Sequence, residues 1–126
     1  MRLIFVALLL IIAPTIFYYF YDLAVYSSWR ISAAEARRRI SRGEFDVIVD
    51  VRTGVERNTL GYYPGSVHIP SSDLETRFPK LYINKEIRIL LYCNTGHRAR
   101  LAADKLHALG YFNTYYISSP HTSLIS

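Results

Sequence analysis

Residues 89–103 read ILLYCNTGHRARLAA, an apolar run and a helical pattern joined by a short polar loop. The apolar run, from Ile87 to Tyr92, has the length and composition of a buried strand. From Leu101 to Leu109 the apolar residues recur at helical spacing, and Gly110 follows as a stop signal. The loop between strand and helix begins with Cys93, the only cysteine in the chain.

Cys93 is open to two interpretations. At the end of a buried strand, a cysteine is ordinarily a small, inert apolar residue. Here, however, backbone N–H groups of the loop and of the next helix are expected to point toward it, and together with the helix dipole they favour an anion. His97 and Arg98 add positive charge, and Gly96 permits a tight bend. The loop is therefore a candidate site for a reactive thiolate and for an anionic group brought to it.

The composition fits one small folded domain. With 126 residues, 51% of them hydrophobic and 20% charged, the chain is too short for two domains and too apolar to be disordered. The net charge of +5 favours anionic small molecules or membrane headgroups as ligands. We expect no nucleic-acid partner, because Arg37-Arg38-Arg39 falls in an amphipathic helix without interleaved aromatic residues. A single cysteine excludes an internal disulfide and leaves the compartment open.

Residues 1–28 are interpreted as a signal anchor. No charged residue lies between Leu3 and Tyr21, and a helix of this length would span about 28 Å. The tyrosines at its end are typical of an interfacial aromatic belt, and Pro14 is tolerated in a membrane helix. No Ala-x-Ala pattern follows, so we predict an uncleaved, single-pass anchor, with a cleaved signal peptide as the alternative. A short amino terminus with a single arginine, here Arg2, most often stays in the cytoplasm, which favours a domain on the extracytoplasmic (periplasmic) side.

Residues 29–126 are predicted to form one α/β domain. Strands are expected at 46–51, 67–69, 87–92 and 114–117. Helices are expected from a Ser32–Glu35 capping box to about residue 41, after Ser71-Ser72-Asp73, and over 99–109. Strands that alternate with helices indicate a central, mostly parallel sheet flanked by helices, with ligands at its carboxyl edge. Both Cys93 and Arg52 fall at that edge, whereas the tail 118–126 is expected to be irregular.

Four motifs over residues 31–117 resemble the rhodanese-like (sulfurtransferase) domain in its small single-domain form. They are VDVRT at 49–53, GYYPGSVHIP at 61–70, LYCNTGHRA at 91–99 and LGYFN at 109–113. Two positions depart from the family pattern: Tyr62 stands where His is usual, and Ala99 where Ser is usual. The family also continues with a closing helix, so the short polar tail here predicts that part of the cover over the sheet is missing.

The resemblance implies a persulfide chemistry. Cys93 would take a sulfane sulfur from an anionic donor (thiosulfate or a persulfide) and pass it to a thiol or to cyanide. The donor would be bound by the loop that follows, in which backbone N–H groups stabilise the persulfide and two cationic side chains attract a sulfonate; its residues are Asn94, Thr95, Gly96, His97 and Arg98. No metal or other cofactor is expected, and the oligomeric state is not predicted.

Asp50 and Arg52 are expected to be structural, as an ion pair or cap at the end of their strand. Glu56 lies close enough in sequence to pair with either of them.

Two rival functions remain open. A cysteine phosphatase or arsenate reductase needs Cys-x5-Arg so that the arginine returns to clamp the anion. Here the sixth residue after Cys93 is Ala99, and Arg98 comes one position too early. The second rival is a non-enzymatic, membrane-anchored interaction module, which the short tail favours and the retained cysteine disfavours. Loss of Cys93 would abolish an enzyme's function and leave partner binding by a module intact.

Overall fold

The computed structural model describes the backbone of residues 1–25 and 29–125, and the side chains of 1–21 and 29–125. Its α/β part contains one sheet of four parallel strands in the order β2-β1-β3-β4. The strands are β1 (Val47–Asp50), β2 (Val67–His68), β3 (Ile89–Tyr92) and β4 (Thr114–Tyr116). The predicted parallel sheet is thus confirmed, with each strand shorter than its apolar run.

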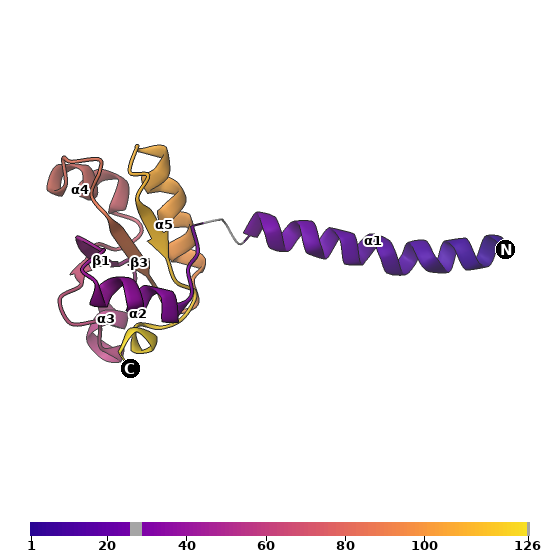
Figure 1. Cartoon of the computed structure of the whole chain (residues 1–126), viewed down its shortest axis with the longest axis horizontal. Coiled ribbons are helices and arrows are strands. Elements are labelled where there is room, and N and C mark those ends of the chain that lie inside the picture. Colours follow the sequence, from indigo (N-terminus) through magenta and orange to yellow (C-terminus); the bar gives the residue numbers. More distant parts are fainter. Residues whose placement is uncertain (26–28, 126) are drawn as a thin grey trace.

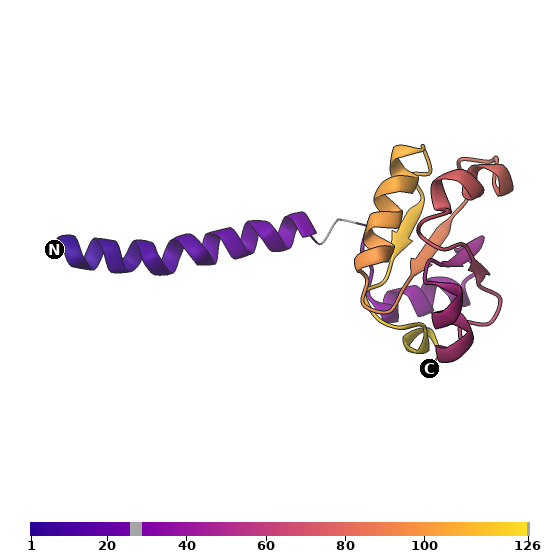
Figure 2. The ribbon, with the colours of Figure 1, turned by 180° about the vertical axis from the view of Figure 1, so that it is seen from behind.

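Helices cover both faces of the sheet (Figures 1 and 2). The helices are α2 (Ala33–Ser41), α3 (Gly54–Leu60), α4 (Leu74–Leu81) and α5 (His97–Ala108). Along β3, Ile89, Leu91 and then Cys93 belong to the core under α4 and α5. Leu90 and Tyr92 belong to a second core with Ala36 of α2. The central strand is therefore buried on both sides, as a parallel sheet requires.

The start of α2 follows half of the predicted capping box. Ser32 Oγ accepts a hydrogen bond of 3.0 Å from the backbone N–H of Glu35. The Glu35 carboxylate, however, pairs with Arg38 and Arg39 within the helix. A complete capping box instead begins α3, where Thr53 and Glu56 exchange both bonds. No helix was predicted between residues 54 and 60, although Thr53-x-x-Glu56 carries the same signal as the capping box predicted at Ser32.

The tail corrects a second expectation. A 3-10 helix, η1 (His121–Leu124), lies in the segment predicted to be irregular. It packs beside α2, with Leu124 buried in the second core, and the Arg37 guanidinium donates to the Ser123 carbonyl at 2.6 Å. Part of the cover that the sequence predicted to be missing is therefore supplied by one short helical turn.

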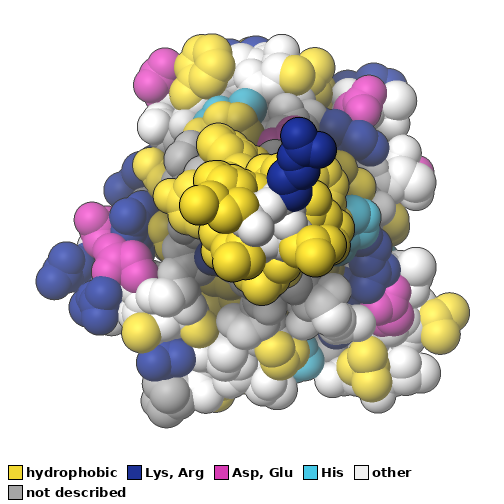
Figure 3. Space-filling model, turned by 90° about the vertical axis from the view of Figure 1, so that its right-hand side faces the viewer, with side chains coloured by type: hydrophobic (Ala, Val, Ile, Leu, Met, Phe, Trp, Pro, Cys, Tyr) yellow, Lys and Arg dark blue, Asp and Glu magenta, His cyan; other side chains and the backbone are white. Residues whose placement is uncertain are grey.

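The amino-terminal segment forms a separate helix, α1 (Arg2–Val25). All of its described side chains are exposed, and the views from two sides show the helix lying clear of the α/β part. Seen end-on, apolar side chains surround it (Figure 3). Helix α1 is apolar all round, is not buried against the rest of the protein and is long enough to cross a bilayer. A signal sequence has the same length and composition.

Trp29 lies next to the edge strand, β4. The Tyr116 N–H donates to the Trp29 carbonyl at 3.1 Å, and the Ile31 N–H donates to the Tyr116 carbonyl at 2.9 Å. The Trp29 ring also stacks on His107 of α5 with 3.6 Å between ring centroids. The chain that leaves α1 is therefore fixed to the domain along β4 from residue 29 onward.

Candidate functional site

The candidate site surrounds Cys93, which directly follows β3 at the carboxyl edge of the sheet. Its side chain is 1% exposed, and its Sγ accepts a hydrogen bond of 3.0 Å from the backbone N–H of Gly96. Helix α5 begins at the next residue, His97, so the positive end of its dipole lies beside the thiol. The loop thus supplies one direct N–H donor and a favourable helix end for a thiolate.

Gly96 makes the bend of this loop and a close contact with the tail. Its φ is +98°, a left-handed conformation that other residues rarely adopt. A Cβ at this position would lie 2.7 Å from the Cα of Ser118. The tail after β4 therefore packs directly against the cysteine loop, and only glycine fits between them.

Asp50 and Arg52 form the expected ion pair, completely buried at the end of β1. The Arg52 guanidinium donates to both Asp50 oxygens at 2.9 and 2.7 Å and to the Gly61 carbonyl at 2.7 Å. Burial raises the pKa of Asp50, but the hydrogen bonds and charge of Arg52, together with the hydrogen bond from Tyr92, outweigh it, and the net pKa lies below the ordinary value. Arg57 and the Tyr92 hydroxyl also donate to this carboxylate, at 3.2 and 3.1 Å.

Glu56 pairs with Arg98 rather than with Asp50 or Arg52. The Arg98 guanidinium donates to both oxygens of the Glu56 carboxylate, at 2.6 and 2.7 Å. These bonds outweigh partial burial and lower the pKa of Glu56 to about 2. The one arginine of the cysteine loop that was expected to attract a donor therefore already holds a carboxylate.

Asn94 joins the two ion pairs. Its Nδ2 donates to Glu56 at 2.6 Å, and its Oδ1 accepts from Arg52 at 3.3 Å. Asn94 and Arg98 thus contact residues at the end of β1 and the start of α3. Thr95 and His97 are exposed to solvent.

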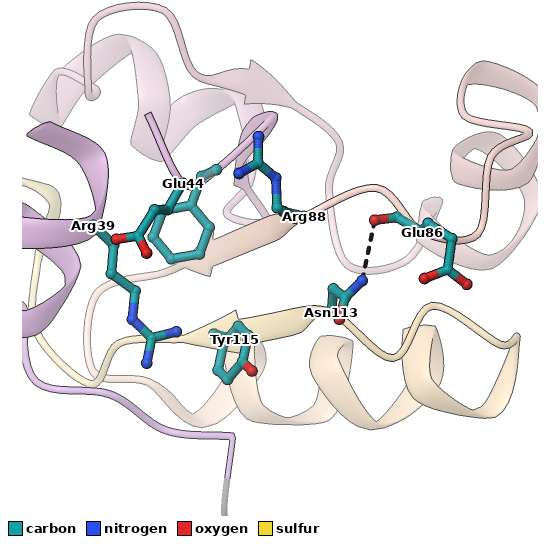
Figure 4. Close-up of a pocket in the computed structure, with 7 residues that line it drawn as sticks. Arg39, Glu44, Glu86, Arg88, Asn113 and Tyr115 are labelled. Atoms are coloured by element: carbon teal, nitrogen blue, oxygen red, sulfur yellow. Dashed lines mark hydrogen bonds between the residues drawn. The ribbon is translucent and has the colours of Figure 1, made fainter. Parts of the chain in front are cut away.

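A pocket of about 280 Å³ lies at the opposite, amino-terminal edge of the sheet (Figure 4). Both arginines that line it are paired with carboxylates outside the lining: Arg88 with Asp46 at 2.7 Å, and Arg39 with Glu35 at 3.0 Å. Because Cys93 follows the other end of β3, this pocket is not part of the cysteine site. Within the described residues, no group of three or more His, Cys, Asp or Glu side chains is placed to hold a metal ion.

Comparison with known proteins decides the family. The sequence profile of the rhodanese-like domain matches residues 32–119. The chain belongs to the rhodanese-like domain family. Its fold agrees, since it superposes on the human single-domain sulfurtransferase TSTD1 with a TM-score of 0.64 and 25% identity, covering 77% of this chain and 95% of that one.

Two curated relatives are similar to this chain over part of their length. YrkF of Bacillus subtilis, a candidate sulfur carrier protein, is 33% identical over 64% of this chain and 42% of its own length. The tRNA sulfurtransferase of Shewanella denitrificans is 34% identical over 73% of this chain and 19% of its own length. The chain thus spans less than half the length of each of these two relatives.

The two departures from the usual rhodanese-like pattern have structural explanations. Tyr62 is half exposed, with the Arg57 guanidinium 3.8 Å above its ring. Ala99 is completely buried in the core under α5, where a hydroxyl would need a partner. Among the described residues, the hydrogen bond to the Cys93 sulfur comes from the Gly96 N–H and involves neither Tyr62 nor Ala99.

Proposed function

We propose that this rhodanese-like chain is a sulfurtransferase that carries a sulfane sulfur on Cys93 and passes it to a thiol or to cyanide. The observation that carries the proposal is the hydrogen bond from the Gly96 N–H to Sγ at the amino-terminal end of α5. A thiolate is the attacking species in such a transfer, and this arrangement favours negative charge on the sulfur. The same donor can stabilise the outer sulfur of a persulfide anion.

The transfer has two balanced steps. The Cys93 thiolate attacks the outer sulfur of the donor; with thiosulfate, the S–S bond breaks and sulfite leaves with the electron pair. An acceptor thiolate or cyanide then attacks the outer sulfur of the Cys93 persulfide, and the Cys93 thiolate is released. Since the thiol is 1% exposed, the loop must shift slightly outward before the sulfur donor or the acceptor can reach it.

The neighbouring residues are assigned positioning roles in this proposal. The Asp50–Arg52 pair holds the carboxyl end of β1 against the cysteine loop. Asn94 connects this pair to the ion pair of Glu56 and Arg98. Gly96 holds the loop bend against the tail. Thr95 and His97, on the exposed side, are placed to meet an incoming donor or acceptor.

We further propose that α1 anchors the chain in a membrane as a single-pass helix, with the domain on the extracytoplasmic side. The length and apolar character of Arg2–Tyr21 support this placement, as does the single basic residue before the apolar stretch.

The first experiment is the intact mass of the full chain in detergent micelles after incubation with thiosulfate or with glutathione persulfide. We expect a gain of one sulfur atom that cyanide reverses and that the Cys93→Ser variant lacks. Circular dichroism establishes that both proteins are folded. If neither donor leaves an adduct on the folded chain, the sulfurtransferase proposal is wrong, and a membrane-anchored interaction module becomes the better explanation.

A further inference from the structure

The arginines around Cys93 are already paired with carboxylates. Arg52 and Arg57 both bond Asp50, and Arg98 bonds Glu56. Sulfonate recognition commonly depends on a guanidinium that can offer two parallel N–H donors. In this chain the guanidinium of the cysteine loop offers those two donors to Glu56 instead.

Glu56 is held firmly in this position. Besides the two bonds from Arg98, its carboxylate accepts from Asn94 Nδ2 at 2.6 Å and from the Thr53 hydroxyl at 3.0 Å. Its pKa of about 2, set chiefly by Arg98, keeps it ionised throughout the physiological range. A fixed negative charge therefore lies beside the cysteine loop, where it repels an anionic donor that approaches Cys93.

We infer that Glu56 determines which donors Cys93 accepts, and that it selects a persulfide of low charge over the thiosulfate dianion. A dianion must either share Arg98 with a carboxylate or displace that carboxylate from its five hydrogen bonds. A persulfide donor, R–S–SH, needs no sulfonate clamp. The Cys93 thiolate attacks its outer sulfur, the S–S bond breaks, and R–S⁻ leaves while the proton stays on the new persulfide. This inference rests on the proposed function and names its donor class.

The direct test compares two alkylating reagents of different charge on the only cysteine of the chain. The rates at which iodoacetate and iodoacetamide modify Cys93 are measured by intact mass for the full chain and for Glu56→Gln. Glutamine can replace glutamate in a capping box, so this variant keeps the start of α3. Removing the negative charge that Glu56 places against Asn94 and Arg98 should raise the iodoacetate-to-iodoacetamide rate ratio about tenfold.

The matched control is Glu35→Gln. Glu35 occupies the same position in its helix and also pairs with arginines, but it belongs to α2, away from the cysteine loop. Its replacement should leave the rate ratio unchanged. A ratio that is equal in wild type and Glu56→Gln would overturn the inference, as would an equal rise in both variants.

Sulfur transfer supplies the second measurement. The rate constant for persulfide formation with thiosulfate should rise about tenfold in Glu56→Gln, while that with cysteamine persulfide, whose ammonium group balances its persulfide charge, should change less than about twofold. Equal changes for the two donors would overturn the donor preference. If the alkylation ratio rises but neither donor transfers sulfur to either protein, the charge effect of Glu56 stands and the proposed function fails.

Discussion

At the scale of single residues, the shape of the cysteine loop depends on Gly96. Its N–H bonds the Cys93 sulfur, its φ is +98°, and its missing side chain leaves room for Ser118. These three features couple the sulfur, the helix start and the tail through one position. A change at Gly96 should therefore affect both stability and the thiol.

We predict that Gly96→Ala lowers the free energy of unfolding by about 3 kcal/mol, from left-handed strain together with the clash against Ser118. Urea unfolding of the full chain measures the change. Gly43→Ala is the control, because Gly43 also has a positive φ, +67°, but has nothing within 4 Å of an added Cβ. It should cost only about 1 kcal/mol. Equal losses in the two variants would show that contact with Ser118 contributes nothing.

The residues that the sequence predicts well are those whose role is local. Gly96 lies in a turn that any tight strand-to-helix loop requires, and Cys93 follows its strand directly. The pairing of Glu56 with Arg98 was not predicted, because the two residues meet only after β1 and β3 have paired side by side. Asn94 likewise bridges two ion pairs whose existence depends on that pairing.

At the scale of elements, the segment after β4 packs back against α2 through η1. Helix η1 contributes Leu124 to the core against α2, and it buries His121 near the end of β1. Helix η1 was not predicted from the sequence, because the segment is mostly polar and contains Pro120. One apolar side chain in a short 3-10 turn gives no periodic pattern. Helix α3 was missed for a different reason: its residues are all at least partly exposed, so it has no buried apolar stripe.

We predict that His121 makes the domain less stable in mild acid. Burial lowers the pKa of His121 below its ordinary 6.5; the nearby Arg52 charge lowers it further, and Asp50 opposes both. Below that ordinary value the unfolded chain binds a proton that the folded chain does not, so the free energy of unfolding falls as pH decreases. Urea unfolding at about pH 7.5 and about pH 5.5 should show this loss in the wild type.

The variant His121→Gln should lose part of this pH dependence, whereas His97→Gln, which changes an exposed histidine of the cysteine loop, should retain it. A pH dependence that is the same in all three proteins would mean that His121 gains its proton equally well in the folded state.

At the scale of the whole molecule, the chain couples one apolar helix to one compact domain by a short connection. Helix α1 ends at Val25, and residue 29 is already paired beside β4. The four Cα–Cα steps between them span at most about 14 Å. If α1 crosses a membrane, the domain and its cysteine therefore lie close to the surface of the bilayer, where the domain's basic side chains meet anionic headgroups.

Side-chain amines make the placement of the domain measurable, because all three lysines, Lys80, Lys85 and Lys105, belong to the domain. We predict that a membrane-impermeant amine reagent modifies them in sealed, right-side-out vesicles, since the domain is proposed to lie outside the cytoplasm. Intact mass of the modified chain also reports whether residues 1–28 are still attached, as an uncleaved anchor requires. Modification of the three lysines only after the vesicles are permeabilised would place the domain in the cytoplasm. A modified chain that lacks the amino-terminal segment would identify α1 as a cleaved signal peptide.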